Sequence, residues 1–236
     1  MSNDFDQARE LLHRQMLSGV SHDLKTPLAT IIGSLEIYTL MAEKLSPEKK
    51  HALLHSALGE AYRLDGFINN ILDMAKLESG LVKVDIAPHD FTLMMNECVS
   101  RLGPLTKSGT ILLQPNLDSI TIYTDAILLA RATRILLDNA LKHAGKNPTV
   151  IVEYAATADE IRIQVQDNGP GIAPGKEELI FSKYTRIPSS DQQNAGTGLG
   201  LALCCQIMKL LSGTAKGHNH PAGGAVFTLL CPNHSI

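Results

Sequence analysis

The chain has 236 residues, of which 44% are hydrophobic and 19% charged, and this balance is typical of a folded globular protein. Its formal net charge of −3 gives no basic footprint for nucleic acid, so we expect no nucleic-acid partner. No apolar run approaches the roughly 18 residues of a membrane-spanning helix, so we expect no membrane segment in this chain. The four cysteines lack a CxxC spacing, which predicts a cytoplasmic chain without structural zinc.

Residues 1–80 have the periodicity of two long amphipathic helices. Apolar residues recur at alternating intervals of three and four, as on the contact face of a coiled coil. In the first helix two rows fit this pattern, namely Leu17, Leu24, Ile31 and Tyr38, and Ser21, Leu28, Leu35 and Ala42. In the second helix the positions are Leu54, Ala57, Ala61, Leu64, Ile68, Ile71 and Ala75. The Ser-Pro pair within Lys44–Lys50 predicts the turn between the helices.

A lone hairpin of two helices buries little apolar surface, so its contact faces need a further partner. Pairing of two hairpins into a four-helix bundle covers these faces, and we therefore expect a homodimer through the helical hairpin. Docking of the hairpin on the rest of the same chain is the alternative.

Residues 81–236 mix short strands with helices and predict an α+β two-layer sandwich. Alternating apolar and polar residues predict strands, and longer amphipathic runs that end at glycine predict helices. The expected strands are 111–117, 119–125, 148–156, 160–169 and a closing hairpin of 215–218 and 223–232, and the expected helices are 126–145 and 199–213. We expect one mixed sheet with helices on one face. Residues 170–197 have no period and predict a long functional loop, or lid.

Four segments of this second part carry groups suited to chemistry. "DNALKHA" places Asn139 and Lys142 about one turn apart on a helix, and "DNGPG" ends a strand with Asp167 and two glycines. "FSKYTR" is an aromatic and basic patch, and "GTGLGLAL" is a glycine-rich loop that opens onto a helix, where backbone amides can hold an anion. Each segment alone is weak evidence, because Asp-Asn-Gly is a common turn and GTGLG matches neither the phosphate loop nor the dinucleotide fingerprint.

Taken together with "SHDLKTP" in the first helix, these segments resemble, in order, the H, N, G1, F and G2 boxes of the sensor histidine kinases of two-component signalling. The resemblance covers nearly the whole chain. It implies a dimerisation and histidine phosphotransfer hairpin over residues 1–80 and a catalytic ATP-binding domain of the Bergerat type over residues 81–236. It also implies an ATP-dependent kinase that autophosphorylates His22, passes the phosphoryl group to an aspartate in the receiver domain of a response regulator, and acts as the phosphatase of that regulator.

The roles of single residues follow from the resemblance. His22 takes the place of the phospho-acceptor, Asp23 that of the acidic residue that assists it, and Thr26 that of the residue linked to dephosphorylation of the partner. Asn139 takes the place of the Mg²⁺ ligand, and Asp167 that of the residue that binds the adenine amino group. The implied nucleotide-binding residues are Asn139, Lys142, His143, Asp167, Gly169, Gly171, Phe181, Tyr184, Arg186, Gly196, Thr197, Gly198, Leu199 and Gly200. ATP and Mg²⁺ are thus the expected cofactors.

The residue pattern around His22 suits an acceptor. In a heptad frame with Ser21 at a, His22 falls at b, beside the contact face, where a rigid helix holds it open to solvent. A neutral imidazole is nucleophilic near pH 7, and a carboxylate at Asp23 can hold the proton on its second nitrogen. Thr26 lies four residues on and faces the same way, and Pro27 removes a backbone donor, which predicts a hinge below the acceptor.

Two other functions share part of this pattern. ATPases of the chaperone, mismatch-repair and gyrase type have the same nucleotide fold without an acceptor histidine, and a degenerate kinase would act only as a scaffold or a phosphatase. The N box departs from the family at Ile135, where a second asparagine is usual, so we expect weaker or more magnesium-dependent nucleotide binding. The sequence leaves open the signal, the regulator, transfer within or between subunits, and whether the chain is the cytoplasmic portion of a longer, membrane-bound sensor.

Overall fold

The computed structural model describes residues 2–102, 109–116, 121–144, 147–183, 185 and 198–234. For residues 2–20 and for His22 it describes the backbone only. The chain divides into two compact units, Met1–Leu72 and Asp73–Ile236, which are treated separately below. No helix in the described part of the chain is both long enough and apolar enough to cross a membrane.

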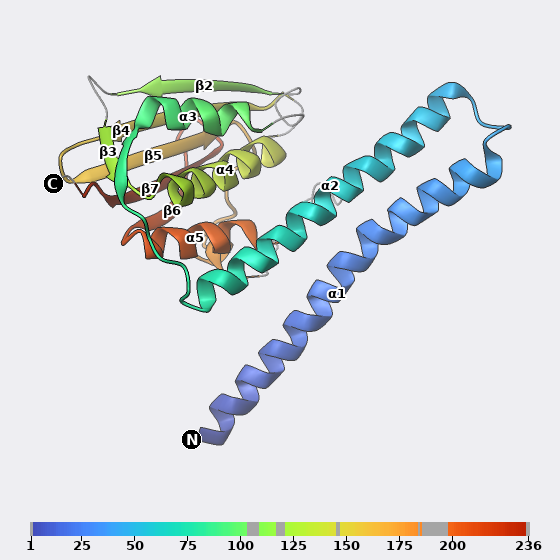
Figure 1. Ribbon diagram of the computed structural model, residues 1–236, viewed down its shortest axis with the longest axis horizontal. Coiled ribbons are helices and arrows are strands. Elements are labelled where there is room, and N and C mark those ends of the chain that lie inside the picture. The colour runs from blue at the N-terminus through green and yellow to red at the C-terminus, as the bar shows by residue number, and fades with distance from the viewer. Residues whose placement is uncertain are drawn as a thin grey trace. The chain divides into compact units, whose positions relative to one another are not determined.

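The first unit is an antiparallel hairpin of two long helices, as predicted (Figure 1). Helix α1 spans Ser2–Met41 and continues without a break through Pro27, whereas helix α2 spans Pro47–Glu78. Pro47 begins α2 at the first helical position, where its missing N–H is harmless, and Ser46 accepts a hydrogen bond from Lys49 N at 3.4 Å. The connection is therefore shorter than the predicted turn. The hinge at Pro27 stays a prediction.

The predicted apolar positions of each helix divide into two rows that differ in exposure. In α1, Leu24, Ile31 and Tyr38 are partly buried, and Pro27 and Ser34 between them are buried. The second row is open: Leu28 and Leu35 expose 46% and 44% of their surface. In α2 the same division separates the less exposed Ala57, Leu64 and Ile71 from the exposed Leu54 and Ile68. A single hairpin thus leaves one apolar row uncovered on each helix.

The second unit is built on a mixed five-stranded sheet with the order β2-β4-β5-β7-β6. Its strands are β2 (Thr110–Pro115), β4 (Thr149–Ala156), β5 (Glu160–Asp167), β6 (Thr214–Asn219) and β7 (Ala225–Pro232). Strand β2 runs parallel to β4, and all the other neighbours are antiparallel. Strands β1 (Ala87–Asp90) and β3 (Thr121–Thr124) form a separate antiparallel pair, so the prediction of one sheet is wrong for the strand expected at 119–125. The alternating burial along β5 places one face of the sheet in the core.

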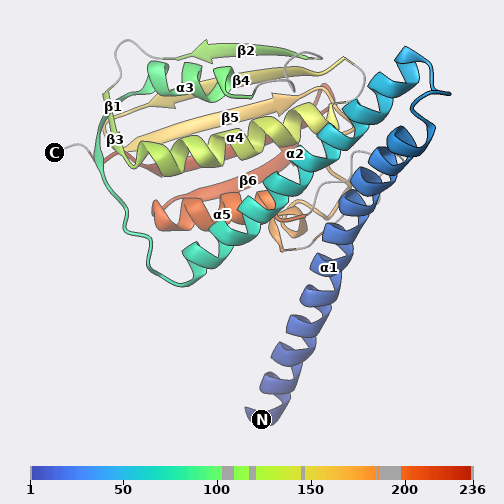
Figure 2. The same ribbon diagram turned by 45° about the vertical axis from the view of Figure 1, so that its right-hand side comes forward.

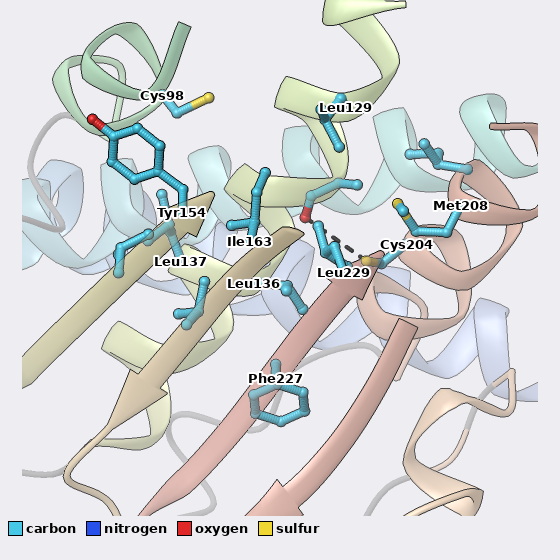
Figure 3. Close-up of a cluster of buried hydrophobic side chains, with 14 of the residues drawn as sticks. Cys98, Leu129, Leu136, Leu137, Tyr154, Ile163, Cys204, Met208, Phe227 and Leu229 are labelled. Atoms are coloured by element: carbon cyan, nitrogen blue, oxygen red, sulfur yellow. Dashed lines mark hydrogen bonds between the residues drawn. The ribbon is translucent and has the colours of Figure 1, made fainter. Parts of the chain in front are cut away.

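Helices α3 (Phe91–Ser100), α4 (Ala126–His143) and α5 (Gly200–Leu210) lie on one face of this sheet (Figures 1 and 2). The predicted two-layer arrangement is therefore confirmed. Between the layers Leu136, Leu137, Ile163 and Phe227 pack in a core with little or no exposure (Figure 3). The Cys204 thiol donates to the carbonyl of Ala132 at 3.8 Å, which ties α5 to α4.

Two features of the second unit were not predicted. Strand β1 and helix α3 are short, and Asp90 caps α3 by accepting a hydrogen bond from Leu93 N at 2.8 Å. The last turns of α2 also belong to this unit, because Met74 is 6% exposed within its core. The compact units therefore meet inside α2, while the functional division at residue 80 stays a prediction.

Candidate functional site

The candidate nucleotide site is centred on Asp167, the last residue of β5, whose side chain is only 4% exposed. Its Oδ1 atom accepts two backbone hydrogen bonds, from Gly169 N at 2.8 Å and from Ala225 N at 3.2 Å. Both bonds end on the same oxygen, so among the described residues Oδ2 keeps its capacity to accept a hydrogen bond from a ligand. A fixed carboxylate with one open oxygen suits recognition of an amino group.

Gly169 brings the turn after β5 against the end of helix α4. A Cβ atom at this position would lie 2.5 Å from the carbonyl oxygen of His143, which is closer than real Cβ contacts allow. Asn168 fixes the same turn, since it accepts from Thr149 N at 2.9 Å and donates to the carbonyl of Asn147 at 3.1 Å. The structure therefore places the predicted N-box and G1-box segments side by side.

Gly171 continues this turn with a positive φ of 80°, which glycine adopts without strain. A Cβ atom here would lie 2.6 Å from Oδ1 of Asn219, so no side chain fits between the turn and the end of β6. Asn219 makes two hydrogen bonds to Ile172: it accepts from the N–H at 2.6 Å and donates to the carbonyl at 2.8 Å. The backbone of the G1 turn is thus held from both sides.

The end of α4 carries the predicted metal-binding and phosphate-binding residues. The Asn139 side chain is partly buried, and its amide has no hydrogen-bond partner within the described ranges. Lys142 is exposed and pairs with Asp138, one turn earlier, at 2.5 Å. Partial burial lowers the pKa of His143, while the Asp167 carboxylate opposes this effect. The lowered pKa favours the neutral form of the His143 ring, and Lys142 supplies a positive charge on this turn.

The predicted G2 box leads into helix α5. Gly198 has a positive φ of 68°, and Leu199, the residue before the helix, is 1% exposed. The Leu199 side chain is therefore part of the core and leaves only its backbone for a ligand. A Cβ atom on Gly200 would lie 3.5 Å from Cγ2 of Ile135, so the start of α5 packs against the position at which the family usually has asparagine. Within the described residues no side-chain hydrogen bond caps α5, and the backbone amides of its first turn suit an anion.

The predicted F box begins at Phe181, the last residue of the short 3₁₀ helix η2 (Leu179–Phe181). The Phe181 ring packs edge-on against Phe227 of β7, with ring centres 6.3 Å apart, and so anchors this segment to the sheet. Lys183 forms an ion pair with Glu78 at the end of α2. Tyr184, Arg186, Gly196 and Thr197, which the sequence also assigns to the site, lie outside the described residues.

The predicted phospho-acceptor belongs to the other unit. His22, Asp23 and Thr26 follow one another along α1, an uninterrupted helix, so residues 22 and 26 share a face. Asp23 is partly buried and Thr26 is exposed. The helix therefore gives His22 and Thr26 the expected spacing on one face of α1.

Sequence reasoning missed Asn168, Asn219 and the backbone of Gly224 and Ala225. A Cβ atom on Gly224 would lie 1.9 Å from the carbonyl oxygen of Asp167, so the β6–β7 turn forms a wall of the same site. The one available signal was the pair of glycines at 223–224 before the last strand, which marks a close backbone approach.

Comparisons with known proteins agree with this arrangement. Residues 12–80 match the family model of the His Kinase A (phospho-acceptor) domain, and residues 124–235 match that of the histidine kinase-, DNA gyrase B- and HSP90-like ATPases. The sensor protein KdpD of Escherichia coli K12 is 33% identical over 96% of this chain, and the sensor histidine kinase MtrB of Mycobacterium leprae is 30% identical over 98%. The chain spans 25% and 42% of the lengths of these two relatives.

Solved structures resemble the chain in fold. The Acinetobacter baumannii histidine kinase AdeS has a TM-score of 0.70 at 20% identity, covering 90% of this chain and 98% of its own. The histidine kinase ThkA, solved in complex with the response regulator protein TrrA, has a TM-score of 0.73 at 18% identity, with 97% of this chain and 64% of that one covered. Full-length ShkA, solved in complex with AMPPNP, has a TM-score of 0.66 at 24% identity, with 94% and 46% covered. The fold around Asp167 is thus that of an ATP-binding domain.

Proposed function

This chain belongs to the sensor histidine kinases of two-component signalling, and from that premise we propose that it transfers the γ-phosphoryl group of ATP to His22 and then to an aspartate of a response regulator. The observation that carries the proposal is that one chain has, in this order, a phospho-acceptor hairpin and an ATP-binding domain. In that domain two backbone bonds hold Oδ1 of Asp167, and Oδ2 is left to accept from a ligand. Neither a plain ATPase nor a scaffold needs both parts.

Asp167 recognises the adenine base. The N6 amino group of adenine is a hydrogen-bond donor, and Oδ2 of the buried carboxylate is the acceptor that the two backbone bonds to Oδ1 leave open. Gly169 and Gly171 keep the wall of the site free of side chains, because a Cβ atom at either position would clash with the protein itself. Selectivity for adenine over guanine follows, since guanine presents a carbonyl oxygen where adenine presents the amino group.

The end of α4 and the start of α5 hold the phosphates. Lys142 supplies positive charge, and the backbone amides at the start of α5 donate to phosphate oxygens. The amide oxygen of Asn139 fits a Mg²⁺ ion, which takes oxygen ligands and commonly shares its sites between one or two side chains and substrate phosphates. Bound there, a Mg²⁺ ion would supply positive charge against the phosphates, with Asn139 as its protein ligand. The protein itself acts mainly by positioning and electrostatics.

At the acceptor, one ring nitrogen of His22 attacks the γ-phosphorus while the other carries a proton. A phosphorus–nitrogen bond forms, the bond from the γ-phosphorus to the bridging oxygen breaks, and ADP leaves with the electron pair. Asp23 holds the ring proton and stabilises the positive charge that develops on the imidazole. In the second reaction the phosphoryl group passes from His22 to a carboxylate of the regulator, and the neutral imidazole is restored.

We also infer that the chain acts as a homodimer through α1 and α2. The exposed row on α1 includes Leu28, Ile32 and Leu35, and that on α2 includes Leu54 and Leu58. These side chains repeat at the spacing of a helical contact face and lie on both helices of the hairpin. A second hairpin packed against them would complete a four-helix bundle.

Incubation with Mg-ATP labelled on the γ-phosphate tests the function. The wild-type chain should acquire label that is stable in base and labile in acid, as expected of phosphohistidine, and should pass it to a receiver domain. His22→Gln should abolish labelling and leave ADP affinity unchanged, because the substitution lies in the other unit. His51→Gln, a change of another helical histidine, is the matched control and should label normally. Release of free phosphate without protein label would instead establish an ATPase, and base-stable label on the His22→Gln variant would refute the acceptor.

A further inference from the structure

We propose that Asn219 is a positioning residue for nucleotide recognition, because its side chain holds the turn Gly169–Ile172 in the shape that accepts the base. The inference rests on the proposed ATP-binding role of Asp167 and adds a residue outside the five sequence boxes. Asn219 ends β6, and its Oδ1 and Nδ2 atoms bind the N–H and the carbonyl of Ile172 at 2.6 and 2.8 Å. The side chain thus bridges β6 to a turn 47 residues earlier in the chain.

Asparagine suits this place because it presents one acceptor and one donor at the same distance from the backbone. Aspartate has the same shape but no donor, so its second oxygen would face the carbonyl of Ile172. Serine can form one of the two bonds at a time, and glutamine is too long for a space in which Oδ1 already approaches the Cβ position of Gly171 to 2.6 Å. The pair of hydrogen bonds therefore selects the side chain.

The same strand pair also fixes the carboxylate that reads the base. Asn219 lies opposite Ala225 in the β6–β7 register, and the N–H of Ala225 donates to Oδ1 of Asp167. One residue pair thus holds both ends of the turn, Asp167 at its beginning and Ile172 at its end. Because Ile172 is 7% exposed, its backbone groups would lose their partners and gain little water if Asn219 were altered.

Asn233 provides a matched control within the same unit. Its amide forms a similar clamp, accepting from Tyr123 N at 2.8 Å and donating to the carbonyl of Thr157 at 2.7 Å. Thr157 follows the end of β4, whereas Asp167 pairs with Val150 near the beginning of that strand. The two clamps therefore lie at opposite ends of the sheet, about 20 Å apart at roughly 3.3 Å per residue. A change at Asn233 tests loss of an amide clamp without contact with the nucleotide site.

The experiment compares Asn219→Asp and Asn233→Asp in the full chain by calorimetric titration with ADP. We expect Asn219→Asp to raise Kd about tenfold or more, since a buried carbonyl loses its donor and the turn loosens. Asn233→Asp should lower Tm as much as Asn219→Asp does, but its Kd for ADP should stay at the wild-type value. In labelling assays Asn219→Asp should raise KM for ATP far more than it lowers kcat, because the turn contacts the base and not the γ-phosphate.

Two further measurements keep the test decisive if Asn219→Asp folds poorly. Asn219→Ser should bind ADP with an affinity between those of wild type and Asn219→Asp, since it can form one of the two bonds without setting a second oxygen against the carbonyl of Ile172. Hydrogen exchange at the Ile172 amide should be slow in the wild type and faster in both Asn219 variants, because a turn that one bond holds opens more often than a turn that two bonds hold. Wild-type affinity in the Asn219 variants, or equal losses at Asn219 and Asn233, would overturn the proposal. A wild-type chain that binds ADP and never labels His22 would refute the kinase function and leave this test intact.

Discussion

The carboxylate of Asp125 accepts a hydrogen bond from the backbone N–H of Asp85 at 3.1 Å, across 40 residues of sequence. The same side chain caps helix α4, because its other oxygen accepts from Leu128 N at 3.0 Å. Asp125 is 8% exposed, and both bonds are partly buried. One buried residue thus joins the segment that follows α2 to the beginning of the helix that carries Asn139.

Asp125→Ala should therefore destabilise the second unit by about 2–3 kcal/mol, since it removes a helix cap and leaves the Asp85 N–H without a partner. Urea unfolding measures the change in free energy of unfolding. Asp90→Ala is the matched control: Asp90 caps α3 through a single bond to Leu93 N and is exposed, so about 1 kcal/mol is expected. Equal losses in the two variants would show that the bond to Asp85 contributes nothing.

Asp167→Asn should weaken ATP binding more than tenfold and reduce the preference for ATP over GTP. Because Oδ1 accepts from two backbone N–H groups, the amide oxygen of asparagine must take that place. The amide NH₂ group then faces the ligand and meets the adenine amino group as a second donor, while the carbonyl of guanine could accept from it. Titration with both nucleotides measures the two affinities.

Asp159→Asn makes the same change of charge in the exposed turn before β5, at the other end of the strand, and serves as the control. It should leave both affinities unchanged. An Asp167→Asn variant with wild-type ATP affinity would exclude the carboxylate from recognition of the base.

Periodicity and glycine placement predicted most of this fold, and local interactions explain why. The long helices and the alternating strands carry their pattern within a few residues, and the turn at Gly169 and Gly171 is marked by residues that tolerate close approach. Helix α3 escaped prediction because its ten residues give too short a period and its cap, Asp90, resembles a loop residue. The two rows of α1 have the same apolar pattern in sequence, so the sequence does not tell which row is covered. Only packing in the structure shows that Ile31 is partly buried and Leu28 exposed.

The candidate site shows the same limit. Asn219 and Asn168 bind backbone groups of residues far along the chain, and a backbone N–H or carbonyl has no sequence signature. Lys142 was predicted near the phosphates from the family resemblance, whereas its pairing with Asp138 appears only in the structure. The ring of Phe181 similarly packs on Phe227, a contact between segments 46 positions apart that no local pattern reveals.

Thr26→Ala should leave labelling of His22 nearly intact and slow the removal of phosphate from the regulator several-fold. Thr26 is exposed four residues after His22 in α1, where its hydroxyl can orient a water but takes no part in the attack on ATP. Thr30→Ala removes a similarly exposed hydroxyl, which donates to the carbonyl of Thr26 at 3.2 Å, and should change neither rate. Equal losses of both activities in Thr26→Ala would identify a structural role for this residue.

Ile135→Asn should lower the magnesium concentration needed for half-maximal labelling. Ile135 lies one turn before Asn139, and its Cγ2 atom is 3.5 Å from the Cβ position of Gly200, at the start of α5. An asparagine here would add an amide oxygen near the phosphates, and Mg²⁺ favours oxygen ligands. The substitution should also weaken packing, because the Ile135 side chain contacts the core. Tm should therefore fall by several degrees.

Ile127→Asn is the control for this substitution, since Ile127 lies on the same helix with 82% of its surface exposed. It should leave both Tm and the magnesium midpoint near their wild-type values. Calorimetric titration with ADP at several magnesium concentrations separates binding from catalysis: a shifted midpoint in ADP affinity places the new amide beside the metal. If a folded Ile135→Asn variant keeps the wild-type midpoint in both assays, residue 135 does not reach the metal, and isoleucine serves there only to pack α4 against α5.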